Sequence, residues 1–169
     1  MAIKDEVLAA NARYADQFSK ADLPVPPGRR FAVVTCMDAR LDPAKYLGLT
    51  EGDAHVIRNA GGLVTDDALR SLVISHWLLG TEEVLIIAHS DCGMLTFSNE
   101  TLQGKLHDET GVDSHDDYLP FGDLEESVLR SVERVRSDPR LPDSYKASGF
   151  VYDVRSGSLK EVTPARVVA

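Results

Sequence analysis

The sequence predicts an α/β fold, in which helices flank a central, mainly parallel β-sheet that carries an antiparallel hairpin at its C-terminal edge. Three observations lead to this prediction. Short runs rich in apolar and β-branched residues recur at 31–35, 54–58, 84–88 and 150–154. Segments with helical periodicity separate them, as the crossovers between parallel strands require. A turn at 155–158 leads into the run 159–162, which can pair with the last strand.

The chain begins with an amphipathic segment that we expect to be helical over residues 4–19. This helix packs either on the chain's own core or on a partner subunit, and the sequence leaves both alternatives open. A proline-rich stretch at 23–28 excludes helix and predicts an extended linker. We therefore expect residues 1–28 to form an arm and linker within a single domain that spans residues 1–169.

Capping signals mark the helices of the middle of the chain. Asp42 followed by Pro43 predicts the start of a short helix that ends near Gly48. The segment 66–79 has apolar side chains on one face and on the flanks of that face, which predicts a largely buried crossover helix ending at Gly80. The remaining expectations are one helix between 94 and 111, a long surface loop at 112–122, and an amphipathic helix at 124–135.

The charge of the chain excludes several classes of partner. Its 169 residues carry a formal net charge of -9, spread along the sequence. A surface of this kind repels nucleic acid and anionic lipid, so we expect neither as a partner. No apolar run approaches the roughly 20 residues of a membrane helix. Acidic residues at Asp5 and Glu6 are not typical of a secretory signal, and a cytoplasmic enzyme is therefore expected.

The two cysteines of the chain follow predicted strands, and both lie beside charged or imidazole side chains. Cys36 comes directly after the first strand, while His89 and Cys92 come directly after the third. If these strands are neighbours in a parallel sheet, the three side chains meet at its carboxyl edge, with Asp38 close by. Two thiolates and an imidazole form a zinc site. Each residue alone could instead occupy an ordinary core position, but their joint placement favours the metal.

Two further features adjoin this candidate site. Asp38 and Arg40 project to the same side of an extended segment, where the arginine can hold the carboxylate through two charge-assisted hydrogen bonds. The alternative is an ordinary surface ion pair, which the preceding buried strand disfavours. The second predicted strand runs into a loop whose glycines let the backbone turn sharply or approach a ligand closely. This loop consists of Asn59, Ala60, Gly61 and Gly62.

Three segments of the chain resemble, in order and in spacing, the signature segments of the β-class carbonic anhydrases. They are Cys36-Met37-Asp38-Ala39-Arg40, Val56-Ile57-Arg58-Asn59-Ala60-Gly61 and His89-Ser90-Asp91-Cys92-Gly93. The similarity is strongest over residues 30–95 and is closest to the short bacterial and archaeal members. It implies that Cys36, His89 and Cys92 bind Zn2+, that Asp38 and Arg40 form a catalytic dyad, and that residues 59–62 line the substrate pocket. It also implies a homodimer or homotetramer.

The reaction that this resemblance implies is the reversible hydration of carbon dioxide to bicarbonate and a proton. Zinc lowers the pKa of bound water to about 7, and the resulting hydroxide attacks carbon dioxide. Asp38 would accept the hydrogen bond of the hydroxide and orient it, while Arg40 keeps Asp38 away from the metal. Without that restraint Asp38 could become a fourth ligand and close the site.

Other functions are compatible with parts of the pattern. The same scaffold and metal could hydrolyse carbonyl sulfide or carbon disulfide, and the shape of the pocket separates these activities. A non-catalytic structural or redox-sensing zinc protein is a second alternative, but a purely structural site has no need of an arginine that draws its fourth ligand away. A nucleotide-binding module is disfavoured, because the loop at 59–62 lacks the G-x-G-x-x-G spacing.

Overall fold

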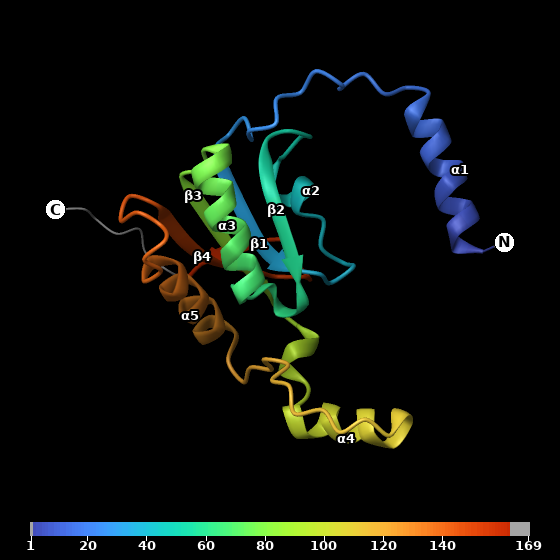
Figure 1. Ribbon diagram of the computed structural model, residues 1–169, viewed down its shortest axis with the longest axis vertical. Coiled ribbons are helices and arrows are strands. Elements are labelled where there is room, and N and C mark those ends of the chain that lie inside the picture. The colour runs from blue at the N-terminus through green and yellow to red at the C-terminus, as the bar shows by residue number, and fades with distance from the viewer. Residues whose placement is uncertain (1, 163–169) are drawn as a thin grey trace.

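The structure, a computed structural model, describes residues 2–162 and contains one five-stranded sheet (Figure 1). The strand order is β2-β1-β3-β4-β5. All pairs are parallel except β4 with β5, which is antiparallel. The predicted fold class is therefore confirmed, including the antiparallel edge. The strands are β1 (Phe31–Cys36), β2 (Ala54–Asn59), β3 (Glu83–His89), β4 (Lys146–Tyr152) and β5 (Leu159–Glu161).

The two central strands bring distant parts of the chain to one edge of the sheet. β1 and β3 are parallel neighbours, with Phe31 opposite Glu83 and Thr35 opposite Ile87. Every residue of β1 is buried, as is expected of a parallel strand that is covered on both faces. Each strand extends to a residue of the candidate site, since Cys36 ends β1 and His89 ends β3. Their carboxyl ends therefore lie side by side.

Helices cover the two faces of the sheet unequally. The apolar side chains of α3 (Asp66–Leu79) and α5 (Leu124–Arg136) pack with Ala32 and Val34 of β1 in one cluster. The alternate residues Phe31 and Val33 point to the opposite face, where the short helix α2 (Pro43–Leu47) packs. The main core thus lies beneath α3 and α5 (Figure 1).

The predicted caps account for the helix boundaries near the site. The Asp42 side chain accepts a hydrogen bond from the backbone N–H of Lys45, and Gly48 ends α2 in the left-handed region, at a φ of 62°. Gly80 ends α3 in the same way, at a φ of 73°. A helix between 94 and 111 is also confirmed, as α4 (Asn99–Thr110). Between α4 and α5 the chain forms the expected long loop.

The predicted bounds of three elements are wrong. β4 begins at Lys146 rather than at 150 and ends at Tyr152 rather than at 154. Its first half, which contains Ala147, Ser148 and Gly149, has low strand propensity but pairs with β3 residue by residue, so tertiary pairing overrides local preference. β5 ends one residue before the predicted end at 162. The first helix, α1, covers Ile3–Ala15 and ends four residues before the predicted end at 19.

The expectation that α3 is largely buried is also wrong. Ala68, Leu69 and Leu72 are buried against the sheet. The other side of the helix is open, and its Trp77 and Leu78 side chains are 62% and 76% exposed. Apolar composition alone did not distinguish these two sides, because a helix laid on a sheet buries only the stripe that faces it.

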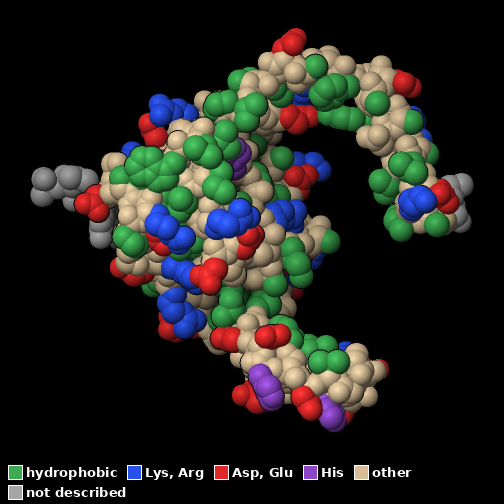
Figure 2. Space-filling model, viewed as in Figure 1, with side chains coloured by type: hydrophobic (Ala, Val, Ile, Leu, Met, Phe, Trp, Pro, Cys, Tyr) green, Lys and Arg blue, Asp and Glu red, His purple; other side chains and the backbone are tan. Residues whose placement is uncertain are grey.

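Two helices project from this body. Neither α1 nor α4 contains a buried residue, and Figure 1 shows both extending to the same side of the sheet. The space-filling view shows a deep hollow between them (Figure 2). Within the described range, no helix combines the length and apolar character needed to cross a membrane.

Candidate metal centre

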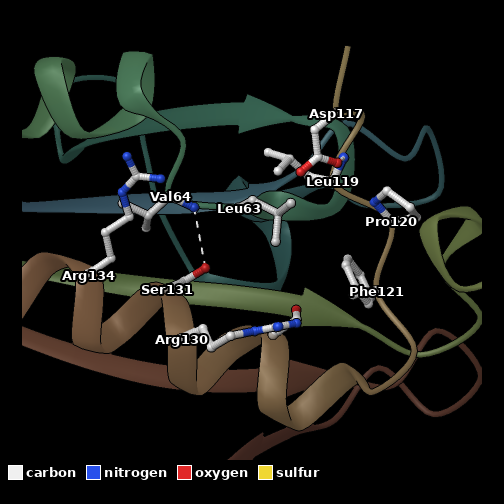
Figure 3. A pocket seen from close by; sticks show the side chains of 10 residues that line it. Leu63, Val64, Asp117, Leu119, Pro120, Phe121, Arg130, Ser131 and Arg134 are labelled. Carbon is white, nitrogen blue, oxygen red and sulfur yellow. Dashed lines mark hydrogen bonds between the residues drawn. The ribbon is translucent and has the colours of Figure 1, made fainter. Parts of the chain in front are cut away.

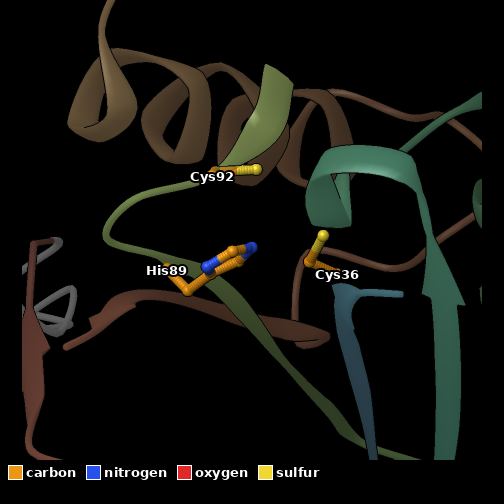
Figure 4. Close-up of side chains that lie close together, drawn as sticks. All are labelled: Cys36, His89 and Cys92. Atoms are coloured by element: carbon orange, nitrogen blue, oxygen red, sulfur yellow. The ribbon is translucent and has the colours of Figure 1, made fainter. Parts of the chain in front are cut away.

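Three predicted ligand side chains meet at the carboxyl edge of the sheet (Figure 4). Cys36 ends β1, His89 ends β3, and Cys92 follows β3 after a tight turn. Their candidate ligand atoms all lie within 4.8 Å of one another, and all three residues are buried. The turn depends on Asp91, whose backbone lies in the left-handed region at a φ of 58°. This conformation returns the chain so that Cys92 faces Cys36.

The imidazole of His89 is oriented as a metal ligand. Its Nδ1 lies 2.9 Å from the backbone oxygen of Ser90, so we assign the ring proton to Nδ1, which donates to that oxygen. Nε2 is then an acceptor, and it is buried without a hydrogen-bond partner in the part of the chain that the structure describes. An unpaired buried nitrogen is costly, and a metal ion would satisfy it.

The hydrogen bonds around the two sulfur atoms favour one negative charge on the pair. A hydrogen bond from the Cys92 thiol, together with bonds from the backbone amides of Asp38 and Gly61, lowers the pKa of Cys36. The same sulfur–sulfur hydrogen bond raises the pKa of Cys92, which keeps the shared proton. A divalent metal ion bound here would replace that proton, since thiols coordinate as thiolates. Two thiolates and one imidazole fit zinc and leave a fourth position free.

Asp38 lies beside these ligands and is held by Arg40. The Nε of Arg40 donates to Oδ1 of Asp38 at 3.0 Å, and Nη2 donates to Oδ2 at 2.8 Å. Chiefly through these bonds, Arg40 holds the pKa of Asp38 well below its ordinary value, so the carboxyl group is ionised. Oδ2 of Asp38 is 3.8 Å from Nε2 of His89. The structure thus brings the predicted dyad to the edge of the metal centre.

The loop after β2 packs against the backbone of Cys36. The side-chain amide of Asn59 donates to the backbone oxygen of Leu63 and accepts from its N–H, which closes the loop. Ala60–Gly62 then form a 3-10 turn. Gly61 donates its N–H to Cys36, whereas a Cβ on Gly62 would lie 2.8 Å from the Cys36 nitrogen. Close approach to β1 is therefore what requires the second glycine.

Comparisons with known proteins identify the family. The carbonic anhydrase family model matches residues 31–119. β-Carbonic anhydrase 1 of Mycobacterium tuberculosis is 47% identical over 164 residues, which cover 97% of this chain and 100% of that protein. The chain belongs to the β-carbonic anhydrase family.

Solved structures and more distant relatives agree with this assignment. The crystal structure of a carbonic anhydrase from Streptococcus mutans superposes with a TM-score of 0.92 at 46% identity, covering 96% of this chain and 99% of that one. A carbon disulfide hydrolase of Acidithiobacillus thiooxidans is 39% identical, covering 80% of this chain and 78% of that protein. Members of the family with a different named substrate are thus also similar to this chain.

Two residues of this β-carbonic anhydrase family member contribute to the site without having been predicted to do so. Arg58 donates from Nε to the backbone oxygen of Cys36 at 3.0 Å and from Nη2 to that of Asp38 at 2.7 Å. Asp91 accepts two hydrogen bonds from Arg40. Both lie within signature segments, and a charged residue at the end of a strand was the available signal for Arg58.

A cavity of about 310 Å³ adjoins the metal centre of this family member without including its ligands (Figure 3). Leu63 and Phe121 line the cavity and also pack in the apolar cluster around Cys36 and Cys92. The opposite end of the cavity is polar and is formed by Ser127, Ser131, Arg130 and Arg134 of α5. Apolar side chains therefore bound the metal centre on this side.

Proposed function

We propose that the protein catalyses the reversible hydration of carbon dioxide to bicarbonate and a proton, with zinc held by Cys36, His89 and Cys92. The observation that carries this proposal is the buried Cys2His cluster with an Asp–Arg pair at its edge. Identity of 47% to a β-carbonic anhydrase over nearly the whole chain supports it.

The side chains around the metal have separate roles in this proposal. When bound, zinc would supply a Lewis acid that makes water nucleophilic near neutral pH. Asp38 is ionised and fixed, so it orients the nucleophile by accepting its hydrogen bond. Arg40 engages both oxygens of that carboxylate and holds it away from the metal. Arg58 fixes the backbone between Cys36 and Asp38, which keeps the ligand and the acceptor in register.

The loop at 59–62 is proposed to line the substrate pocket through its backbone. The Asn59 side chain closes the loop through its hydrogen bonds to the backbone of Leu63, so Asn59 would shape the pocket without contacting the substrate. Ala60 carries only a methyl group and Gly61 has no side chain, so this part of the loop would leave room for a linear triatomic molecule. The N–H of Gly61 is already used by Cys36, so its role would be to stabilise the thiolate rather than to bind substrate.

Hydrolysis of carbon disulfide or carbonyl sulfide is the second candidate, and the Acidithiobacillus relative favours it. The zinc-loaded protein should be assayed with carbon dioxide, carbonyl sulfide and carbon disulfide from neutral pH to about 8.5, above the pKa of about 7 expected of zinc-bound water. We expect carbon dioxide to be turned over fastest. Turnover of only the sulfur compounds would establish the second candidate, and no turnover at full zinc content would favour a structural zinc site.

We further infer that the protein acts as a homo-oligomer, at least a dimer, in which α1 packs on a second copy. A helix of 13 residues with no buried side chain is marginal by itself in water. Nevertheless α1 presents exposed apolar side chains, which are Ile3, Val7, Leu8 and Tyr14. A second copy that covers these apolar side chains would stabilise the helix and remove them from water.

The hollow beside the sheet supplies a surface for such a partner. β2 forms the open edge of the sheet, and its Val56 is 42% exposed. Between β2 and α3 lies a groove of about 400 Å³ whose lining includes Val56, Ile57 and Ile74. A second copy seated in the hollow would cover this groove and α1 together (Figure 2).

A further inference from the structure

The guanidinium of Arg40 is held from two sides. On one side, Nε and Nη2 donate hydrogen bonds to the two carboxylate oxygens of Asp38. On the other side, Nη1 donates to Oδ2 of Asp91 at 2.9 Å, and Nη2 donates to the backbone oxygen of Asp91 at 2.9 Å. Asp91 lies between the ligands His89 and Cys92, so Arg40 connects the dyad to the turn that carries the metal ligands.

The backbone of Asp91 makes this double contact possible. Its left-handed conformation is one that aspartate tolerates better than most residues. In this conformation both the carbonyl oxygen and the carboxylate of one residue reach the same guanidinium. The turn therefore has two consequences, since it returns Cys92 to the metal centre and presents two acceptors to Arg40.

A second Asp-x-Arg pair in the chain shows what Asp91 adds. Arg140 donates from Nε to Oδ1 of Asp138 at 2.9 Å and from Nη2 to Oδ2 at 2.8 Å, nearly as Arg40 does with Asp38. Within residues 2–162, however, Asp138 is the only carboxylate at ion-pair distance from Arg140. The bidentate pair is thus a local consequence of the spacing. The second carboxylate distinguishes the arginine at the metal centre.

We propose that Asp91 is a positioning residue that fixes Arg40 and thereby keeps Asp38 off the metal. This inference rests on the proposed function, in which the fourth metal position must stay open. Asp38 needs restraint, because its Oδ2 lies only 3.8 Å from the ligand atom of His89. With Asp91 in place, Arg40 cannot follow Asp38 towards the metal without breaking its bonds to the ligand turn.

The expected effect is modest. The side chains of Arg40 and Asp91 are 48% and 67% exposed, so water screens their attraction. Exposed ion pairs contribute little, so we expect the equilibrium between the restrained and the metal-bound position of Asp38 to shift by no more than about fivefold. Removal of the Asp91 side chain should therefore favour closure by about two- to fivefold, rather than abolish the site.

Binding of azide to the cobalt(II)-substituted protein tests this directly, because its visible spectrum reports occupation of the fourth position. Four proteins are compared: the original chain, Asp91→Gly, Asp38→Asn, and the double variant. Glycine suits the left-handed backbone at 91, so the turn is retained. We expect Asp91→Gly to weaken azide binding two- to fivefold more when residue 38 is Asp than when it is Asn.

Measuring Asp91→Gly with Asp and with Asn at position 38 separates the proposed effect from a direct effect of the Asp91 charge on azide binding. Loss of a nearby negative charge strengthens anion binding directly, but it does so equally with Asp or Asn at position 38. Asp91→Asn, which keeps a neutral acceptor and the turn, should give a smaller shift than Asp91→Gly. The same change in azide affinity in both backgrounds would overturn the proposal. The readout is binding, so inactivity of the original chain towards carbon dioxide would refute the proposed function separately.

Discussion

Asp38 owes its proposed role to its position rather than to its pairing. Asp138 forms nearly the same bidentate contact with Arg140 as Asp38 forms with Arg40. Only Asp38, however, lies beside the buried histidine whose Nε2 faces the two sulfur atoms. A carboxylate at that place can accept a hydrogen bond from a nucleophile at the metal, whereas the distant pair can only stabilise the fold.

Replacement of Asp38 by Asn should separate metal binding from turnover. We expect Asp38→Asn to retain zinc, because all three ligands remain, and to lower carbon dioxide hydration by about 10- to 100-fold, the usual effect of losing a group next to the ligands. Stopped-flow hydration and elemental analysis of the same sample measure both quantities. Unchanged turnover would remove Asp38 from the mechanism.

Asp138→Asn is the matched control, and it should leave turnover unchanged. Arg140 lowers the pKa of Asp138, so folding favours the ionised carboxylate. The resulting stabilisation is present above the ordinary aspartate pKa of about 4 and is lost as the pH falls below it. Urea unfolding should therefore distinguish Asp138→Asn from the original chain at neutral pH, and the difference should shrink in acid.

The metal ligands could be predicted from the sequence because they lie at or just after the ends of predicted strands. Cys36, His89 and Cys92 were identified because each follows an apolar run, and neighbouring parallel strands place their ends together. The contributions of Arg58 and Asp91 were not, since their hydrogen-bond partners Asp38 and Arg40 lie 20 and 51 positions away in the sequence. Such contacts depend on strand register and turn geometry, which spacing alone does not determine.

At the level of elements, the fit between the β2 loop and β1 positions the first ligand. Gly62 has a φ of 66°, and a Cβ there would lie 2.8 Å from the nitrogen of Cys36 and 2.9 Å from the carbonyl carbon of Thr35. Both neighbours are backbone atoms of a buried strand, which cannot yield as a flexible side chain can. A side chain at this position must therefore displace Cys36 or the loop.

Gly62→Ala should destabilise the fold by about 2–5 kcal/mol, from the left-handed backbone and from overpacking together. Zinc affinity should fall as well, because Cys36 moves. Gly80→Ala is the matched control: its φ is 73° but nothing lies within 4 Å of its Cβ, so it should cost about 1–2 kcal/mol and leave zinc affinity unchanged. Equal losses of stability and zinc affinity in both variants would contradict this account.

Element boundaries were predictable where a cap defines them and less so elsewhere. Asp42 and Gly80 marked helix ends correctly, because the signal is local. The start of β4 was missed, since its Ala147–Gly149 segment becomes a strand only by pairing with β3. Likewise, the sequence did not show that Trp77 faces outward, because exposure depends on which side of α3 meets the sheet.

At the scale of the whole molecule, α1 projects from the body, and within residues 2–162 no other element buries any of its side chains (Figure 1). Val7→Asp should shift the protein towards smaller species, because it places a charge where apolar contact with a second copy is inferred. Ala9→Asp, on the opposite side of the same helix, should leave the mass unchanged. Sedimentation velocity measures both variants. An original chain that is a stable, zinc-loaded and active monomer would contradict the inferred assembly.

The most direct test of the central claim is a zinc titration of the metal-free protein, followed by stopped-flow hydration of carbon dioxide. If Cys36, His89 and Cys92 form one catalytic zinc site per chain, activity should rise linearly with added zinc and level off at one zinc per chain. Hydration that persists in the metal-free protein, or full binding of one zinc without hydration at any pH up to about 8.5, above the zinc-water pKa of about 7, would contradict the claim.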